Sequence, residues 1–429
     1  MTLSFRHFLM IMLPCAALLG PAISVEKVYL FHVISIIAVI PFFLMLRDSE
    51  KSELINRNKA FWLIAPLWFI TSFIWAENTS QALRFELQLL TGLFCLFSLQ
   101  VFIRNIGDFN KVLKALGVLF VIHLVISLLE AYTSFRLPVS PISPLVKSIR
   151  SDQWVQNLNY PSFYENYPTS FFWHPNNLAL VTVCSLPLIF SSKIHYLFKV
   201  LAWLTSLIVI IKAGAKAMLV LFSVYSLAML YKCISTSGKV RRAFLPIALV
   251  FAIVGTLFWT SLEKEQKHEL KQSFVTFSRY AAILPKFVAN QFFDQDYKLE
   301  FHGNTRERFL FMEAAIAEYK KSPLLGIGAG QLYSKKVSLH GREVNLTSIH
   351  NYWLEMFVIG GPFFFLGYIA WFVWISFKLI ASNDVRDRSF GESMILFFFA
   401  APVMSSVFYF LPKWLLYGLA IKRLQLSKQ

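Results

Sequence analysis

The feature that most limits what this chain can fold into is a succession of apolar runs, each close to the ~20 residues that an α-helix needs to cross a bilayer. Only 15% of the residues are charged and 56% are hydrophobic, which excludes an ordinary soluble domain. We therefore predict an all-α polytopic membrane protein with about 12 transmembrane helices, residues 1–429 forming a single integral-membrane domain. The predicted spans are 7–24, 28–46, 60–77, 84–103, 112–131, 171–191, 195–212, 214–231, 243–261, 350–378, 390–404 and 406–421.

Three features of the sequence complete this class assignment. Residues 1–24 have the pattern of a signal peptide, but a second apolar stretch follows almost at once, which favours a retained first span. The four cysteines show no CxxC motif and no metal-ligand spacing, so neither a disulfide framework nor a metal site is expected. The net charge of +17 comes without a recognisable nucleic-acid module. We expect membrane lipids, and no nucleic acid, among the partners.

The short loops between the predicted spans indicate an orientation. Lys and Arg recur on one side of the membrane when the spans alternate, and this bias is typical of cytoplasmic loops. Both termini are therefore predicted to be cytoplasmic, and the sequence leaves open whether 390–404 and 406–421 are two spans or one tilted helix. The residues that set the orientation are Arg47, Lys51, Arg57, Lys59, Arg104, Lys111, Lys114, Lys232, Lys239, Arg241, Arg242, Lys378, Arg386, Arg388, Lys422, Arg423 and Lys428.

Two long connections then lie on the outer face, at 132–170 and 262–349. The second contains "RERFLFMEAAIAEYKK", which places apolar residues at helical spacing and predicts an amphipathic helix over 306–321. "PLLGIGAGQL" follows it and predicts a turn. Because "GIGAG" lacks the Lys-Ser/Thr and the strand context of a P-loop, it is not a nucleotide site. An outer loop of this length and structure is usually functional.

Cationic side chains occur in two outer stretches, "IIKAGAKAML" and "NTRERF". Lys216 stands at the outer end of a predicted span, where it could equally extend to the lipid headgroups. Arg306 and Arg308 open the amphipathic helix, and one of them could simply be solvated. A positive pocket just above a bilayer is what a lipid-linked diphosphate requires, since Arg offers a bidentate fork and Lys a compact charge.

The stretch "SIHNYWLE" puts three polar groups at the mouth of a predicted span. His350 has an ordinary pKa near neutrality, although a lone histidine is more often structural. Asn351 stands beside it, and Glu355 should be buried and paired. A direct contact between His350 and Glu355 is doubtful at a spacing of five residues. Gly360, Gly361 and Pro362 predict a kink further along the same span.

The stretch "FFWHPNNLAL" predicts a helix entry, with Pro in the first turn and polar residues able to cap. His174 and Asn176 are therefore either capping residues or ligand contacts, and the sequence leaves both open. The chain has no HExxH motif, so no metal ligands and no cofactor are predicted.

Taken together and in this order, these stretches resemble the O-antigen ligase/polymerase family of bacterial envelope glycosyltransferases. The likeness lies in the "GAKA" stretch at 214–217, in Arg308 through "SPLLGIGAG", and in "HNYWLE" with its following Gly pair. "HPNNLA" and "SFIWAENTSQALRFELQLL" are similar to earlier family segments. Lys216 stands where the family has Arg, which keeps the charge but loses the bidentate fork. Met312 replaces a family Trp and is interpreted as a packing change.

The resemblance implies a lipid-dependent (GT-C-like) glycosyltransferase architecture and a metal-independent, inverting transfer from undecaprenyl diphosphate. It implies that His350, Arg308 and Lys216 are catalytic, His350 as a base or an orienting group facing the acceptor. Arg308, in the loop 262–349, would neutralise the diphosphate together with Lys216. The expected substrate-binding residues are Arg306, Asn351, His174, Asn176, Arg84 and Glu355.

The same resemblance implies an inner-membrane, multi-pass enzyme whose site faces the periplasm or outer side. Its acceptor would be lipid A-core for a ligase, in lipopolysaccharide biosynthesis, or a glycan for a polymerase of O-antigen, capsule or teichuronic-acid type. The donor-side motifs do not separate these two. A transporter of an anionic lipid-linked substrate is a weaker alternative, because transporters place charges near the midplane, often with internal repeats. A pilin-directed transferase and a structural subunit are the remaining alternatives.

Overall fold

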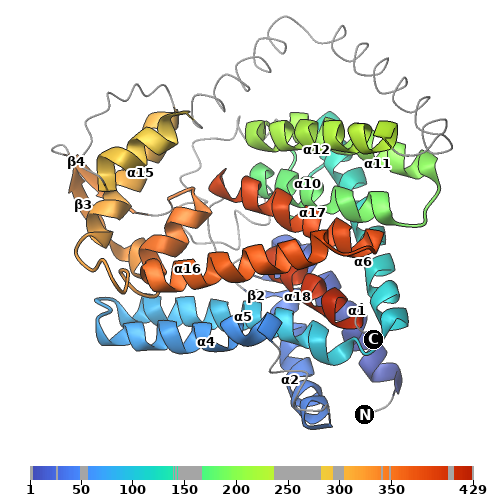
Figure 1. Cartoon of the computed structure of the whole chain (residues 1–429), viewed down its shortest axis with the longest axis horizontal. Coiled ribbons are helices and arrows are strands. Elements are labelled where there is room, and N and C mark those ends of the chain that lie inside the picture. Colours follow the sequence, from blue (N-terminus) through green and yellow to red (C-terminus); the bar gives the residue numbers. More distant parts are fainter. Residues whose placement is uncertain are drawn as a thin grey trace, which may run out of the picture.

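The computed structural model describes residues 3–25, 28–48, 57–138, 140, 143, 167–235, 282–292, 304–339, 342–346, 349–403 and 410–427. These residues are mainly helical, in agreement with the predicted class. The helices are α1 Leu3–Leu19, α2 Leu30–Asp48, α4 Arg57–Thr71, α5 Thr79–Phe102, α6 Ile106–Tyr132, α10 Pro175–Ser191, α11 Tyr196–Lys212, α12 Lys216–Ser235, α15 Asn304–Tyr319, α16 Tyr352–Ile380, α17 Val385–Ala400 and α18 Leu411–Leu426 (Figure 1). Short 3-10 turns follow several of them, including η2 Ser72–Ile74 and η3 Gln331–Ser334.

Two antiparallel strand pairs interrupt the helices. β1 Ser24–Val25 pairs with β2 Val28–Tyr29, and β3 Lys336–Leu339 pairs with β4 Arg342–Asn345. The expectation of a purely helical chain missed both pairs. The second has a local cause, because "KVSLHGREVN" alternates apolar and polar residues on both sides of a glycine.

Most predicted spans coincide with helices to within a few residues. The span at 243–261 and most of the loop at 132–170 lie outside the described residues. The stretches at 390–404 and 406–421 are two helices, α17 and α18, which answers the question that the sequence left open. Among the described residues, three helices are long and apolar enough to cross a membrane, and these are Thr79–Phe102, Ile106–Tyr132 and Tyr352–Ile380. The count of about 12 spans stays a prediction.

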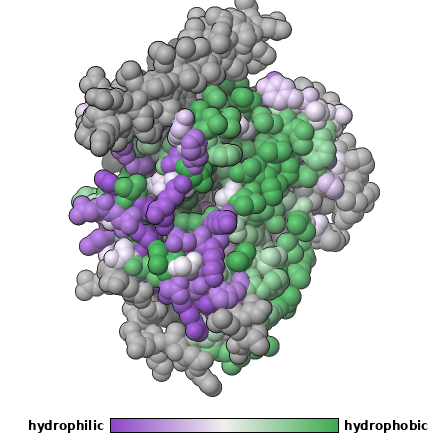
Figure 2. All heavy atoms as spheres, turned by 90° about the vertical axis from the view of Figure 1, so that its right-hand side faces the viewer, coloured by the Kyte–Doolittle hydropathy of each residue, from purple (hydrophilic) through white to green (hydrophobic). Residues whose placement is uncertain are grey.

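The packing is that of a helix bundle with apolar outer surfaces. α5 and α18 lie against each other because Gly92 meets the Trp414 ring and Gly418 meets Leu96 and Leu99, so small residues let the backbones approach. Many large apolar side chains face outward on α2, α6 and α11. Figure 2 shows a broad hydrophobic surface beside a gathering of hydrophilic residues. A surface of this kind suits contact with lipid, and the chain is an integral membrane protein.

The predicted amphipathic helix at 306–321 is confirmed as α15. Its predicted apolar face is buried, and the buried residues are Phe309, Met312, Ile316 and Tyr319. The predicted kink is confirmed in α16, which is two helices joined at Gly361 (φ 72°, ψ 176°). Gly tolerates this left-handed backbone, and Pro362 cannot continue the ladder of hydrogen bonds.

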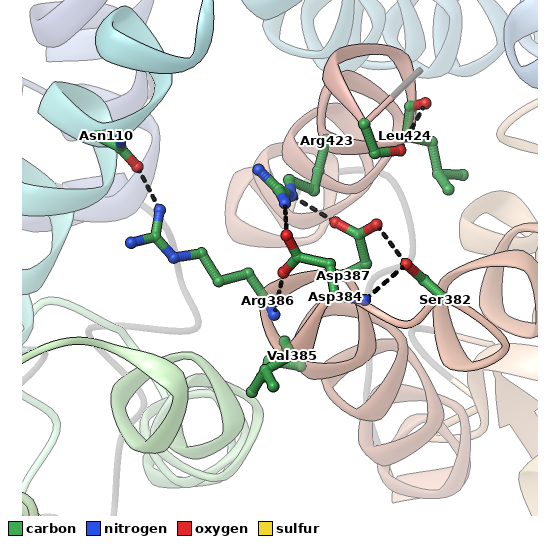
Figure 3. A network of polar contacts seen from close by, with 10 residues as sticks. Asn110, Ser382, Asp384, Val385, Arg386, Asp387, Arg423 and Leu424 are labelled. Carbon is green, nitrogen blue, oxygen red and sulfur yellow. Dashed lines mark hydrogen bonds and ion pairs between the residues drawn. The ribbon is translucent and has the colours of Figure 1, made fainter. Parts of the chain in front are cut away.

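Near the beginning of α1 and the end of α18, charged residues form a network that we call the paired cluster. Arg6 binds Asp108 at 2.7 Å, joining α1 to α6. Arg423 of α18 binds Asp387 at 2.5 Å and Asp384 at 2.6 Å, at the start of α17 (Figure 3). Arg386 of α17 reaches the side chain of Asn110 on α6 at 2.7 Å.

The paired cluster corrects one assumption behind the predicted orientation. Lys59, Lys422 and Arg423 were counted as loop cations, yet all three are buried. Lys422 donates to the Gln100 carbonyl and Arg423 binds Asp387, so these two hold helices together rather than face solvent. The orientation itself stays a prediction, supported by the remaining loop cations.

Candidate active site

His350 stands two residues before Tyr352, the first residue of α16. Its φ of +52° is left-handed, a conformation that histidine adopts more readily than most side chains but at a cost in strain. Asn351 caps the helix, since its Oδ1 accepts the Leu354 N–H at 3.2 Å. Strain of this kind at a helix mouth is typical of functional sites.

The electrostatic environment of His350 keeps it neutral. Burial, with a smaller contribution from the positive charge of Arg308, lowers its pKa from 6.5 to about 4. Arg308 lies half-buried in the second turn of α15. In the part of the chain that the structure describes, no carboxylate pairs with Arg308. The guanidinium is thus a cation beside a neutral imidazole.

His174 is the third member of this group. Burial, with smaller contributions from His350 and Arg308, lowers its pKa from 6.5 to about 4. These contributions place all three residues within electrostatic reach of one another. Its Nδ1 accepts the Asn176 N–H at 3.1 Å and so caps α10. In the neutral ring the proton must then be on Nε2, which leaves one donor. The capping prediction is confirmed, and the ligand prediction stays open.

The loop before His174 is held by buried polar contacts. Glu130 accepts the N–H groups of Thr169 at 2.8 Å and Ser170 at 2.6 Å, and the Ser170 hydroxyl lies 2.9 Å from His123 Nδ1. Ser170, like His350, has a left-handed φ, of 47°. These contacts of Glu130 were not predicted from the sequence, although a glutamate near the end of an apolar run is a signal for a buried polar contact.

Asn351 and Glu355 are engaged with protein groups. Asn351 donates to the Met312 sulfur at 3.7 Å, so the capping residue of α16 also touches α15 one turn beyond Arg308. Met312, interpreted from sequence as a packing change, is thus a contact between the two helices. The buried Glu355 accepts a hydrogen bond from Tyr333 at 2.6 Å and interacts electrostatically with the buried Lys413.

Lys216 and Arg84 are described but not joined to this group, whereas Asn176 is bonded to His174 through its backbone N–H. Lys216 is exposed as the first residue of α12, after the left-handed Gly214, against which Tyr167 packs. Arg84 is exposed on α5, and Asn176 is half-buried in the first turn of α10. In the described ranges no interaction links Lys216 or Arg84 to His350.

One predicted side chain lies outside the described residues, and two residues that interact with Glu355 were not predicted. Arg306 belongs to α15, but its side chain lies outside the described part of the chain. Lys413 and Tyr333, which contact or interact with Glu355, were missed. The signal for Lys413 was a lysine directly after proline at the head of an apolar run.

Comparison with known proteins agrees with this geometry. Residues 200–372 match the family model for O-antigen ligase, a range that contains Lys216, Arg308 and His350. No curated protein matches the chain. The match extends from α11 into α16, and so it includes both helices that bring Arg308 and His350 together. This membrane protein therefore carries an O-antigen ligase family domain, and its function is of the O-antigen ligase or polymerase type.

Proposed function

We propose that the protein transfers a glycan from undecaprenyl diphosphate to an acceptor hydroxyl at the outer face of the inner membrane, with lipid A-core as the preferred acceptor. The observation that carries this proposal is the grouping of Arg308, His350 and His174, in which the cation has no described carboxylate partner. An arginine of this kind is available to an anionic substrate.

On the donor side, Arg308 would bind the diphosphate and neutralise the charge that develops as it leaves. Lys216 is a second cation for the same group. It opens α12, where the helix dipole disfavours a lone positive charge and favours an anion, so a bound phosphate would stabilise both the lysine and the helix end. No interaction with Arg308 is described for Lys216, and the donor would have to join them.

On the acceptor side, His350 would accept the proton of the attacking hydroxyl. The oxygen forms a bond to the anomeric carbon, the bond from that carbon to the diphosphate oxygen breaks, and the diphosphate leaves with the electron pair. Attack opposite the leaving group inverts the anomeric centre. Because the low pKa of His350 keeps its imidazole neutral, the ring can accept the proton as the hydroxyl becomes more acidic during bond formation. The Nε2–H of His174 is a donor for the acceptor or the phosphate.

The alternative within the family is a polymerase that joins lipid-linked repeat units. It would use the same donor chemistry, so Arg308 and His350 support it equally, and only the acceptor differs. A transporter is favoured less, because Arg308, His350 and His174 lie at helix entries rather than in the middle of a span.

The test is a purified assay with an undecaprenyl-diphosphate-linked glycan and EDTA, in which lipid A-core and the lipid-linked repeat are offered separately. Product on lipid A-core supports the ligase, and longer lipid-linked chains support the polymerase. His350→Asn should abolish transfer while tolerating the left-handed backbone. Transfer by a folded His350→Asn protein at the wild-type rate would contradict the proposed base.

A further inference from the structure

The break in α16 leaves three consecutive carbonyls without their helical partners. Val358 would ordinarily bond to the N–H of residue 362, which is proline and has none. The ordinary partners of Ile359 and Gly360 are the N–H groups of residues 363 and 364, and the non-helical backbone at Gly361 interrupts these bonds. Unsatisfied carbonyls at membrane depth are costly, so each needs a donor from elsewhere.

Those donors come from two distant segments. The Ile327 N–H binds the Val358 carbonyl at 2.9 Å, and the Gly328 N–H binds the Ile359 carbonyl at 3.1 Å. The indole N–H of Trp68, on α4, binds the Gly360 carbonyl at 3.0 Å. All three carbonyls are therefore satisfied in order along the chain.

This contact requires glycine on both sides. A Cβ on Gly326 would stand 2.5 Å from the Gly361 nitrogen and from the Ile359 oxygen, and one on Gly361 would stand 2.7 Å from the Leu324 oxygen. Both glycines also have left-handed φ values, of 77° and 72°. The two backbones are in direct contact, with no room for a side chain between them.

The other end of the same segment holds the beginning of α5. The Ala329 N–H binds the Ser72 hydroxyl at 2.9 Å, and the Gln331 side chain exchanges two hydrogen bonds with the backbone of Asn78, at 2.9 and 3.0 Å. We call residues 326–331 the glycine segment. It follows α15 after residues 320–325, and hydrogen bonds hold it to α16, to η2 and to the entry of α5.

The position of this segment connects it to the site. α15 carries Arg308 near its first turn and ends at Tyr319, shortly before the glycine segment, and the Tyr319 hydroxyl binds the Pro323 carbonyl at 2.5 Å. In the middle of α15, the Met312 sulfur accepts a hydrogen bond from the Asn351 amide. The helix with Arg308 is thus held at two points against the helix that follows His350.

We propose that the glycine segment and the Trp68 indole, by binding the carbonyls at the break in α16, fix Arg308 beside His350. We call this set of contacts the backbone joint. The residues of the glycine segment and Trp68 are then positioning residues, which do not touch substrate. The effect of the joint on transfer rests on the proposed function, but the positioning can be measured without it. Among the residues that the structure describes, Arg308 and His174 are charged and titratable groups that interact electrostatically with His350.

The test measures the apparent pKa of His350 from the pH dependence of its modification by diethyl pyrocarbonate, which attacks the neutral ring, with peptides resolved by mass spectrometry. Trp68→Phe removes one donor and keeps the ring that stacks on Phe364. Its matched control is Trp203→Phe, which removes an indole hydrogen bond to Ser226 between α11 and α12.

The pKa of His350 should rise in Arg308→Gln and rise part of the way in Trp68→Phe, because Arg308 moves away. Adding Trp68→Phe to Arg308→Gln should give no further rise, and Trp203→Phe should leave the pKa at its wild-type value. Gly326→Ala should act like Trp68→Phe but more strongly. The proposed joint would be wrong if the pKa of His350 stayed unchanged in Trp68→Phe. It would also be wrong if the increases in pKa from the two single variants added up in the double variant.

Transfer adds a second readout. Trp68→Phe should lower kcat about 10-fold with little change in KM, as expected when reacting groups are slightly misplaced. If Arg308 proves unnecessary for transfer, the proposed function fails while the pKa coupling can still hold. If the coupling is absent while Arg308 is essential, only the joint fails.

Discussion

The arginines of this protein fall into two groups that differ in their partners. In the paired cluster, Arg6 and Arg423 are buried and bonded to aspartates at distances of 2.5 to 2.7 Å. At the candidate active site, Arg308 is half-buried and has two neutral histidines, but no described carboxylate, around it. The same side chain thus serves to hold helices together in one place and is available to an anion in the other.

The difference follows from the cost of burying charge. A guanidinium removed from water needs compensation, and in the paired cluster the protein supplies it with aspartates. At Arg308 an acidic partner would compete with a phosphate, so a half-exposed cation with neutral neighbours is the arrangement that keeps an anion site open. The predictions below separate the two roles, from the largest effect to the smallest.

The largest effect is expected on stability, in the paired cluster. Arg423→Met leaves Asp387 buried without its cation and should lower the free energy of unfolding by about 3–5 kcal/mol. Transfer per folded molecule should not change. The measurement is denaturation in detergent beside an activity assay. In the double variant Arg423→Met/Asp387→Leu much of the loss should be recovered, and no recovery would mean that the pair is not what holds α18 to α17.

The next effect is expected on activity at Arg308. Arg308→Ala should reduce glycan transfer about 100- to 1,000-fold, the usual loss for one group that stabilises developing charge. Its unfolding midpoint should stay near that of the wild type. Arg388→Ala, at an exposed arginine of α17, is the control and should keep full activity. A stability loss at Arg308 as large as that at Arg423 would erase the distinction between the two groups.

A smaller effect concerns pH. His350 acts as a base only when neutral, and its pKa of about 4 lies below the ordinary 6.5, so the rate should persist as pH falls below 6.5 and drop near about 4. In Arg308→Gln the remaining activity should drop at a higher pH. The same shift contributes stability that is present above 6.5 and lost as pH falls toward about 4. A rate that already halves near 6.5 would argue against a buried neutral base.

The smallest effect is expected for an exposed pair. Glu77 binds Lys335 at 2.5 Å with a mostly exposed side chain, and this hydrogen bond lowers the pKa of the carboxyl. Glu77→Gln should cost less than about 1 kcal/mol, because water and salt screen such pairs. What stability the pair gives should be lost as pH falls through the carboxyl pKa. A larger loss in unfolding experiments would show that this loop acts as part of the buried framework.

The sequence predicted those parts of the fold that depend on local pattern. Apolar runs of membrane length became helices, and the spacing of Phe309, Met312, Ile316 and Tyr319 predicted the buried face of α15. The kink in α16 followed from a Gly-Gly-Pro stretch. In each case the information is contained within about 20 neighbouring residues.

The site could be predicted only as a set of candidates. Alternation of spans placed His174, Arg308 and His350 on one side, but their approach depends on contacts between segments far apart in the chain. The Ile327 bond to the Val358 carbonyl and the Trp68 bond to the Gly360 carbonyl have no signature in composition or periodicity. The glycines in "GIGAG" predicted a turn, but they did not indicate that this turn would contact the break in α16.

The broken helix also bears on how the chain is made. Residues 362–380 alone extend about 28 Å at 1.5 Å per residue, enough for the hydrocarbon thickness of about 30 Å, so the part of α16 before the break need not cross. Ile327, Gly328 and Trp68 all precede α16 in the sequence. During synthesis they leave the ribosome before Val358, Ile359 and Gly360, so all three donors have already been made when these carbonyls emerge.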